Sequence, residues 1–392
     1  MASRPNHGRV SYLHRPAGRY EDMPQARTAL VASDTLPYPP SAKPRRPDLP
    51  SLTTIRALAA LVVFAYHLHP WSDVPWLRPL QYGYAGVTLF FVLSGFILTW
   101  TYDPGQTRTH FLIRRLARIY PTYVVVLAAV VLWSLVSGKG RDPFAVLTNI
   151  TLIHAWFTDP AVYAGINGVT WSLSCEIFFY ALFPALWRLI RDVPFRWVAW
   201  ALGATFTVYT VVVISVVTQP ATRDLLQVLY ANPLVRLPEF VMGVVAARLV
   251  IEGRRMPSWL TATTVGFAAA GALFLPQWPA ANVWTAPLAA GAIIWLARRD
   301  LRRTAAPKWT WPQFAGRASY AFYLVHGLVL LRLEHSGLGS RAAIGLGVSA
   351  VAAVLLHLTV EVPAGRRITA LLKARPCQRP SKEASRAHRF DT

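Results

Sequence analysis

Long apolar stretches, separated by short polar or basic runs, dominate the chain from about residue 55 to residue 360. Each stretch has roughly 15 to 21 residues, and an α-helix needs about 20 apolar residues to cross a bilayer. The pattern predicts an all-α membrane protein with about ten transmembrane helices. The expected spans are residues 55–69, 86–101, 119–136, 171–190, 197–217, 234–251, 259–276, 280–297, 318–334 and 342–360.

One further apolar segment, residues 144–157, is short and contains Asn149 and His154. We interpret it as a re-entrant or interfacial piece. Basic residues give an independent argument, since cytoplasmic loops are enriched in Lys and Arg. With ten spans and a cytoplasmic N-terminus, loops on the inner side carry runs such as Arg254 and Arg255, and outer loops carry few basic residues. An eleventh span at 144–157 would invert this alternation, so we expect both termini in the cytoplasm.

The two ends of the chain differ in composition from its middle. Residues 1–50 are rich in Arg, Pro and Ser and contain no long apolar run, which is typical of a disordered tail. No apolar segment of a signal peptide is present there. We therefore expect a basic cytoplasmic tail at 1–50, a transmembrane domain at 51–362 and a basic cytoplasmic tail at 363–392.

Composition agrees with a lipid environment. Hydrophobic residues make up 54% of the chain and charged residues 15%, whereas a soluble domain carries about 25% charged residues. The net charge of +22 is spread in short runs beside apolar segments and forms no continuous basic face, which argues against nucleic acid as a partner. Two cysteines are too few for a disulfide framework or a cysteine zinc site, and we expect no metal.

Ionisable side chains within a membrane span are costly and tend to mark functional cavities. His67 and Glu176 are both expected in the outer half of the membrane, where a carboxylate beside a histidine would suit general-base catalysis. The same pair would equally suit a proton relay in a transporter, and a lone histidine can simply hold two helices together. The other candidates within or near spans are His326, His357, Arg56, Arg236, Glu239 and Glu361.

Three arginines precede the third span, at Arg114, Arg115 and Arg118. Anchoring at the cytoplasmic surface explains such a run without any further function. Arg115 and Arg118, however, are spaced to share one helical face. A pair of forked guanidinium groups suits a phosphate or pyrophosphate, and an acyl-CoA carries both.

Seven motifs in order resemble those of the acyltransferase-3 family of membrane acyltransferases. The resemblance covers about Leu49 to Arg367, and its first motif is an Arg-x10-His signature at Arg56 and His67. The other six are the segments Gly86–Phe96, Arg114–Pro121, Trp171–Glu176, Arg236–Gly243, Gly316–His326 and Glu361–Pro363. The resemblance implies ten membrane helices, the same number that the apolar stretches and the basic loops predict.

The resemblance implies an acyl-CoA-dependent O-acyltransferase, an enzyme that moves acetyl or another short acyl group to a hydroxyl of a glycan or natural product. It implies that His67 is the principal catalytic residue, with Arg56 and Glu176 in support and Arg115 and Arg118 binding acyl-CoA as co-substrate. Arg236, Glu239 and His326 would be supporting residues. No bound cofactor is expected, and the expected location is a cell membrane, in a bacterium the plasma membrane.

The chain departs from the family pattern at three places. Thr53–Ile55 replace the usual Asp-Gly before the first arginine, and Ile177 stands where a second acidic residue usually follows Glu176. No hydrolase-like domain is appended. The opening Leu49–Thr53 resembles compact members, some of which acylate macrolide-type antibiotics.

Two other functions remain open at this stage. A proton-coupled transporter could use the same buried His and Glu, although no internal repeat of the kind common in transporters is visible. A catalytically silent scaffold would leave the co-occurrence of the buried ionisable residues unexplained. For an acyltransferase, His67 could act as a general base on the acceptor or carry the acyl group itself.

Overall fold

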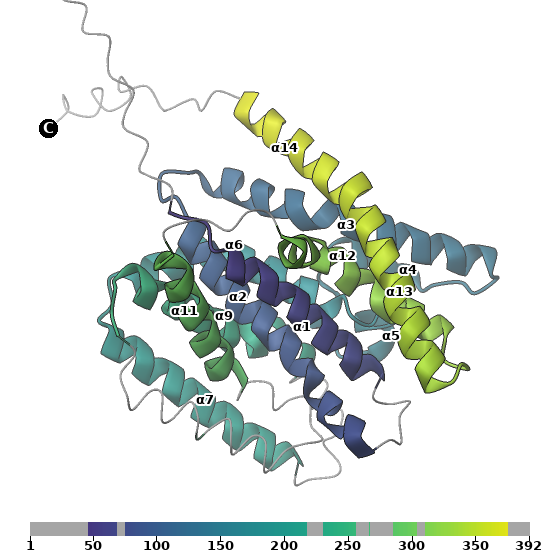
Figure 1. Cartoon of the computed structure of the whole chain (residues 1–392), viewed down its shortest axis with the longest axis horizontal. Helices are drawn as coiled ribbons and strands as arrows, with labels where there is room; N and C mark the ends of the chain where they lie inside the picture. Colours follow the sequence, from purple (N-terminus) through teal and green to yellow (C-terminus); the bar gives the residue numbers. More distant parts are fainter. Residues whose placement is uncertain are drawn as a thin grey trace, which may run out of the picture. The chain divides into compact units, whose positions relative to one another are not determined.

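The computed structural model describes residues 46–68, 75–217, 230–255, 266, 285–303 and 310–374. Within these ranges the chain is entirely helical and has no β-strand. Apolar helices suit a bilayer because they satisfy all their backbone hydrogen bonds internally. The long helices are α1 (Pro50–Leu68), α2 (Ala85–Thr101), α3 (Arg108–Val136), α6 (Trp171–Arg191), α7 (Phe195–Val217), α9 (Pro233–Ile251), α11 (Ala286–Leu301), α12 (Trp311–Arg332) and α13 (Leu338–Leu356) (Figure 1).

Seven helices of the described part are long and apolar enough to cross a membrane. They contain α1, α2, α3, α6, α7, α12 and α13, and the last of them continues from Leu338 to Leu372. Helix α9 carries Arg236, Glu239 and Arg248, and α11 has only 16 residues, so neither is among the seven. The expected span 259–276 lies, apart from Gly266, outside the described residues. The all-helical membrane fold is thus confirmed, and the count of ten stays a prediction.

The segment between α3 and α6 folds into three short helices, α4 (Pro143–Ile150), η3 (His154–Trp156) and α5 (Pro160–Tyr163). Asp142 and Asp159 cap the first and the third, and a proline follows each cap. None of the three is long enough to cross a bilayer. The region 144–157 therefore does not form an additional transmembrane helix.

The start of α1 is fixed from a distant part of the chain. The carboxylate of Asp300, in the last turn of α11, accepts hydrogen bonds from the backbone N–H and the hydroxyl of Ser51, at 2.8 and 2.6 Å. This carboxylate satisfies a free N–H in the first turn of α1, as a capping residue would. Helix α1 consequently begins at Pro50, five residues before the expected span.

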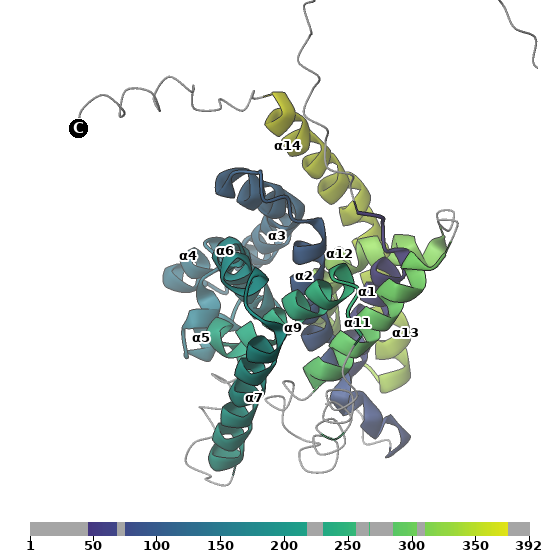
Figure 2. The same ribbon diagram turned by 90° about the vertical axis from the view of Figure 1, so that its left-hand side faces the viewer.

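Close contacts between backbones define how the central helices pack. Helix α1 lies beside α12, and a Cβ added to Gly316 of α12 would be 1.8 Å from the carbonyl oxygen of Thr53. Helices α2 and α9 approach as closely where Gly95 faces Phe240 and Gly243 faces Val92. Only glycine leaves room for backbones at these distances. Two views at right angles show α1, α2, α9 and α12 grouped together, with α7 along one side (Figure 2).

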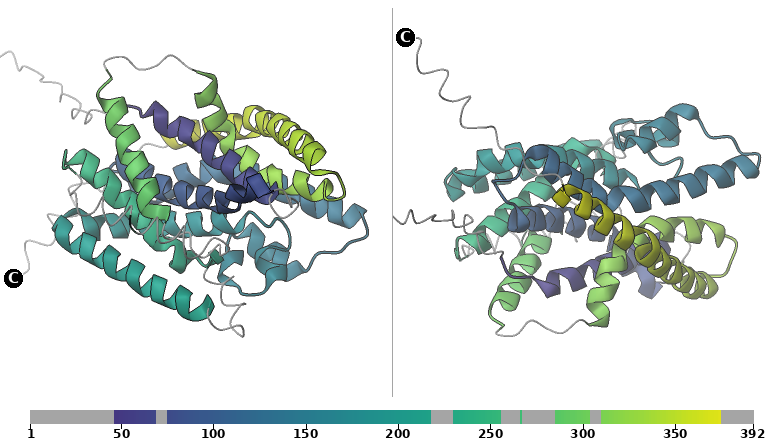
Figure 3. Two further views of the ribbon diagram at one scale, coloured as in Figure 1. Left: turned by 60° about the horizontal axis from the view of Figure 1, so that its bottom comes forward. Right: turned by 90° about the horizontal axis from the view of Figure 1, so that it is seen from above.

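The chain does not end its helical structure at residue 362. After α13 a π-helical turn, η6 (His357–Glu361), continues directly into α14 (Val362–Ala374). Helix α14 packs across α3 (Figure 3). The first part of the expected C-terminal tail is therefore a helix that belongs to the fold. At the other end, Arg46 donates to the carbonyl of Trp100 at 2.9 Å, so the ordered domain begins before residue 50.

Candidate active site

Two histidines meet where α1 and α12 lie side by side. Nε2 of His326 is 3.2 Å from Nδ1 of His67, and the two rings are nearly perpendicular, with centroids 4.9 Å apart. The contact joins residues 259 positions apart in the sequence. Since Gly316 contacts Thr53 and His326 contacts His67, α1 and α12 run in the same direction.

The hydrogen bonds of the two rings define one arrangement of protons. Nδ1 of His326 is 2.7 Å from the carbonyl oxygen of Tyr323, which can only accept, so this nitrogen carries the proton. In the neutral ring Nε2 of His326 then has a lone pair that faces His67. Nδ1 of His67, which is also 2.8 Å from the carbonyl of Val63, donates. The remaining nitrogen of His67, Nε2, is left with a lone pair.

Aromatic side chains surround this pair. Phe322 stacks on the ring of His326 with an interplanar angle of 7°, and Tyr66 meets His67 edge to face. Phe64 and Tyr323 complete the contacts with His326. These rings hold both imidazoles in an apolar setting, in which a neutral histidine is favoured.

The N-terminal end of α6 is tied to the same part of α12. The hydroxyl of Tyr323 donates to the carbonyl of Val169 at 2.8 Å and lies 2.8 Å from the hydroxyl of Ser172. Asn167 donates to the carbonyl of Leu324 at 3.0 Å. The first turn of α6 therefore lies at the level of the two histidines. Sequence analysis did not single out Tyr323 or Ser172, and their only signal was their position within the motifs of His326 and Glu176.

A second polar cluster involves Arg56, Arg115, Glu176 and Tyr180. Tyr180 and Ser94 both donate to Glu176, the latter at 3.4 Å, and Arg115 donates to the hydroxyl of Thr101 at 2.8 Å. Arg56 interacts electrostatically with Glu176 and Tyr180, and its buried Nε has no hydrogen-bond partner in the described part of the chain. Tyr180 was missed from the sequence, although it lies one helical turn after Glu176.

Glu176 and His67 are not in contact. The polar contacts of His67 in the described structure are with Val63 and His326, whereas Glu176 is bound by Tyr180 and Ser94. The sequence predicted Glu176 beside His67, whereas in the structure His326 occupies that position. The reason is that α6 begins level with the histidines and runs opposite to α12, so Glu176, about 7 Å further along the helix, lies toward Arg56.

One stripe of α1 connects the two clusters. Arg56 and His67 are eleven residues apart, which is about 16 Å along the helix and just over three full turns. The two side chains therefore project from the same face, and Ala60 and Val63 lie buried between them on that face. The site thus has two ends, an arginine-rich end at Arg56 and a histidine end at His67.

Arg236 and Glu239 form a fully buried ion pair on α9, with Nη1 and Oε1 2.9 Å apart. The guanidinium lies over the rings of Phe91, Trp171 and Tyr230, at 5.4 to 5.7 Å. Each charge is compensated by the other, as a buried ion pair requires. The aromatic contacts of Arg236 join α9 to the neighbouring helices, which is a structural role. The structure brings these two residues together but shows no direct contact of either with His67.

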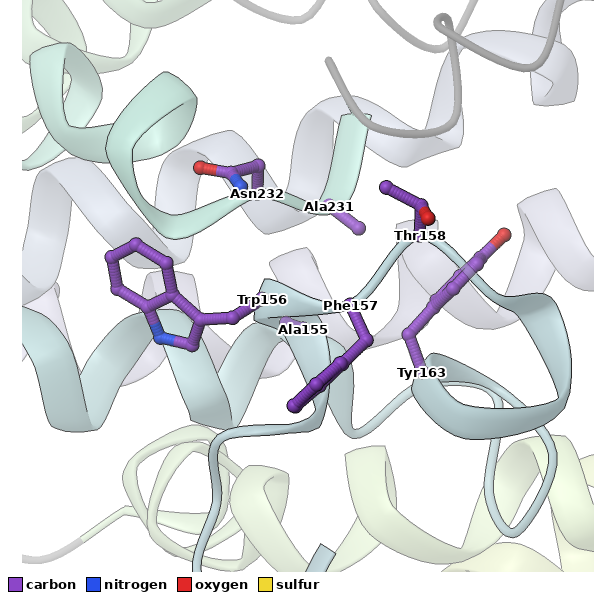
Figure 4. Close-up of a pocket in the computed structure, with 7 residues that line it drawn as sticks. All are labelled: Ala155, Trp156, Phe157, Thr158, Tyr163, Ala231 and Asn232. Carbon is purple, nitrogen blue, oxygen red and sulfur yellow. The ribbon is translucent and has the colours of Figure 1, made fainter. Parts of the chain in front are cut away.

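A small depression beside the start of α9 is lined by aromatic side chains, among them Trp156, Phe157 and Tyr163 (Figure 4). Its volume is about 10 Å³, which is room for about one water molecule. Nearby His154 is completely buried, and burial lowers its pKa to about 4, so it is neutral. Neither feature extends the site of His67.

Comparison with known proteins identifies the family of the chain. The model of the Acyltransferase domain of the acyltransferase-3 family matches residues 49–359. The chain is 34% identical to acyltransferase MdmB of Streptomyces mycarofaciens over 363 residues, which covers 82% of this chain and 93% of that protein. It is 29% identical to the exopolysaccharide production protein ExoZ of Rhizobium meliloti over 326 residues, covering 76% and 95% respectively.

A shorter match, 30% identical over 158 residues, is to peptidoglycan O-acetyltransferase OatA of Listeria monocytogenes, covering 36% of this chain and 24% of that protein. No solved structure matches the chain. The family match spans most of the described helices, including the two that carry His67 and His326. The chain therefore belongs to the acyltransferase-3 family, and it is a multi-pass membrane enzyme that transfers acyl groups.

Proposed function

We propose that this enzyme transfers a short acyl group from acyl-CoA to a hydroxyl of a macrolide-type natural product or a glycan, with His67 as the central catalytic residue. The observation that carries the proposal is the contact of His67 Nδ1 with His326 Nε2. Because of this contact, Nε2 of His67 carries no proton, and its lone pair points in a fixed direction. Both an acid–base and a nucleophilic role require such a lone pair. The names of two relatives, an exopolysaccharide production protein and a peptidoglycan O-acetyltransferase, support a glycan as acceptor, and the name of the first supports acyl transfer.

In the general-base route, Nε2 of His67 takes the proton of the acceptor hydroxyl while its oxygen attacks the thioester carbonyl. The C–S bond then breaks, and the acyl group remains bonded to the acceptor oxygen as an ester. The CoA thiolate leaves and receives the proton from the imidazolium of His67. His326 and the carbonyl of Val63 both accept from Nδ1 of His67, so together they hold its ring in the required tautomer, as the aspartate does in a catalytic triad. In the alternative route Nε2 itself attacks the thioester carbonyl, and the C–S bond breaks to release the CoA thiolate. The acceptor hydroxyl then attacks the acyl-histidine and gives its proton to the thiolate, and the C–N bond breaks to return the free His67.

The donor would enter at the opposite end of the site. Arg115 and Arg118, together with Arg56, provide guanidinium groups for the phosphates of acyl-CoA, and the pantetheine arm would extend along the face of α1 toward His67. Glu176 supports this arginine cluster as an electrostatic partner of Arg56 and Arg115. We place this end on the cytoplasmic side of a bacterial plasma membrane, where acyl-CoA is available. The competing transporter function gains no support from the family or from the relatives.

The test uses protein purified in detergent and incubated with acetyl-CoA labelled in the acetyl group. A library of hydroxylated macrolides and glycans serves as acceptor, and products are identified by an added acyl mass. The wild-type protein should transfer label, and His67→Gln should reduce the rate by at least about 100-fold, since general-base catalysis alone contributes about 100- to 10,000-fold. Full activity in His67→Gln would contradict the role of this residue.

The same preparation separates the two routes. Label that remains bound to the protein after denaturation in the absence of acceptor, and that is lost in His67→Gln, indicates the acyl-histidine. Label that never becomes bound to protein under single-turnover conditions, although product forms, indicates the general-base route. A chain that transports solutes without any dependence on acyl-CoA would refute acyl transfer altogether.

A further inference from the structure

An open groove of about 570 Å³ lies between α3 and α14, and neither His67 nor His326 lines it. Helix α3 contributes Arg114 and Arg118, and α14 contributes Gly365 and Arg366. Glu361, the last residue of the π-helical turn, also lines the groove. The two helices that form it pack against one another (Figures 1 and 3). Helix α14 begins after residue 359, where the match to the family model ends.

The arginines of the groove have no acidic partner. Arg114, Arg118 and Arg366 are exposed, and none makes a hydrogen bond or an ion pair with another residue of the described structure. The one carboxylate in the groove, Glu361, accepts a hydrogen bond from Nδ1 of His357 at 2.9 Å. Three guanidinium groups around an open space therefore remain available for an anion, and phosphate matches their forked geometry.

The groove lies near the arginine end of the active site. Arg118 and Glu361, which line it, both interact electrostatically with Arg56 on α1. Arg56 in turn shares its helical face with His67. A ligand that binds in the groove by its phosphates could thus extend toward His67, which a surface site for lipid headgroups would not require. This proximity of the groove to Arg56, together with its three free guanidinium groups, is the reason for preferring a substrate over an anionic lipid.

Small residues provide room for the rest of a nucleotide. Ala117, Gly365 and Ala370 line the groove between the arginines. A Cβ added to Gly365 would meet no heavy atom within 4 Å, so α14 presents an open face at this position. Adenosine could lie against these residues, with its phosphates directed to the guanidinium groups.

We infer that the groove between α3 and α14 binds the nucleotide phosphates of the acyl-CoA donor, through Arg114, Arg118 and Arg366. This inference rests on the proposed function, because it presupposes an acyl-CoA donor. It adds a positively charged wall from α14, of which the family motifs include only the first two residues, Val362 and Pro363. It also divides the arginine run of α3, since Arg114 and Arg118 line the groove whereas Arg115 donates to the hydroxyl of Thr101 at the end of α2.

The experiment measures the binding of CoA to the full-length chain in nanodiscs of phosphatidylcholine. Arg366→Ala should weaken binding about tenfold, the usual effect of losing one charge-assisted hydrogen bond. Gly365→Leu should weaken it at least as much, because Gly365 lines the groove and an added Cβ there meets no heavy atom within 4 Å, so the new side chain takes up space that the ligand needs. Kinetically, both variants should raise the KM for acyl-CoA and leave kcat at saturating donor and the KM for the acceptor nearly unchanged.

Two matched variants serve as controls. Arg367 is exposed on α14 beside Arg366 but does not line the groove, so Arg367→Ala should bind CoA as the wild type does. Gly347 of α13 also has no heavy atom within 4 Å of an added Cβ, so Gly347→Leu controls for a new apolar side chain. Dephospho-CoA, which lacks the 3′-phosphate, should bind more weakly than CoA to the wild type, and this difference should shrink in Arg366→Ala.

The outcomes distinguish this inference from the proposed function. If neither the wild type nor His67→Gln binds CoA, the acyl-CoA donor itself is wrong. If both bind CoA but Arg366→Ala and Gly365→Leu bind it unchanged, the groove is not the donor site, and the proposed function stands. If phosphatidylglycerol copurifies with the wild type and is lost in Arg366→Ala while CoA binding persists, the groove binds lipid and the inference is refuted.

Discussion

Nε2 of His326 accepts a hydrogen bond from Nδ1 of His67 at 3.2 Å, so one histidine orients the other. The carbonyl of Tyr323 fixes the proton of His326 on Nδ1, which makes the direction of the bond between the rings definite. In this arrangement His326 takes the place that a carboxylate has in a catalytic triad, although as a neutral group it stabilises an imidazolium less. Glu176 was the residue that sequence analysis expected in this place.

The first prediction separates orientation from bulk packing at position 326. His326→Gln keeps an acceptor oxygen that can reach Nδ1 of His67, whereas His326→Leu keeps the volume and loses the acceptor. We expect His326→Leu to lower kcat roughly 100-fold, the usual effect of misplacing a catalytic group by about 1 Å, and His326→Gln to be affected less. The pH profile of kcat/KM should change in the leucine variant, because the imidazolium of His67 loses the ring nitrogen that accepts its Nδ1 proton beside the carbonyl of Val63. Equal activity of the two variants would show that His326 only fills space.

The second prediction concerns the contact that brings the histidines together. A Cβ at position 316 would lie 1.8 Å from the carbonyl of Thr53, so Gly316→Ala forces α1 and α12 apart. We expect a loss of about 1–3 kcal/mol in the free energy of unfolding, as for other overpacked interiors, and a fall in kcat as His326 moves away from His67. Thermal unfolding in detergent and acetyl transfer measure the two effects. Gly347→Ala, at a helical position without neighbours, should be neutral or slightly stabilising.

The helices themselves could largely be predicted from the sequence. Helix α2 was expected at 86–101 and occupies 85–101, and α6 was expected at 171–190 and occupies 171–191, because an apolar run of this length defines its own limits. Helix α1 begins earlier than expected, because its cap comes from Asp300 on α11. Such a contact between distant helices leaves no local signal.

The site could be predicted only in part, for a similar reason. Arg56 and His67 were identified because charge and imidazole are costly in a membrane helix. Their relation to Glu176 depends on how deep α6 begins, and that depth follows from the short helices between residues 143 and 163. The pairing of His67 with His326 depends on the packing of α1 against α12 at Gly316, which hydrophobic periodicity does not encode.

The third prediction assigns Arg236 and Glu239 to stability. Both side chains are fully buried and lie 2.9 Å apart, so removing one leaves an uncompensated charge. Arg236→Met or Glu239→Met alone should cost about 3–5 kcal/mol of folding stability and lower the yield of folded protein. The double substitution should recover most of this loss, since no buried charge remains. A double mutant that still folds but transfers no acyl group would instead indicate that the pair acts in catalysis.

The fourth prediction concerns Glu176, which the structure places with Tyr180 and Arg56 and not with His67. If Glu176 acts by holding the arginine end of the site, Glu176→Gln should change the KM for acyl-CoA. The KM for the acceptor and the lower limb of the pH profile of kcat/KM, which reports the protonation of His67, should remain as in the wild type.

Tyr180→Phe is the matched variant for this test, since it removes one hydrogen bond to the carboxylate and keeps the ring. It should shift the KM for acyl-CoA in the same direction as Glu176→Gln, and the two changes together should have less than their summed effect, because both act through one contact. Activity assays over a range of pH and donor concentration measure all three variants. A displaced lower limb in Glu176→Gln, with an unchanged KM for acyl-CoA, would show that this carboxylate acts on His67 after all.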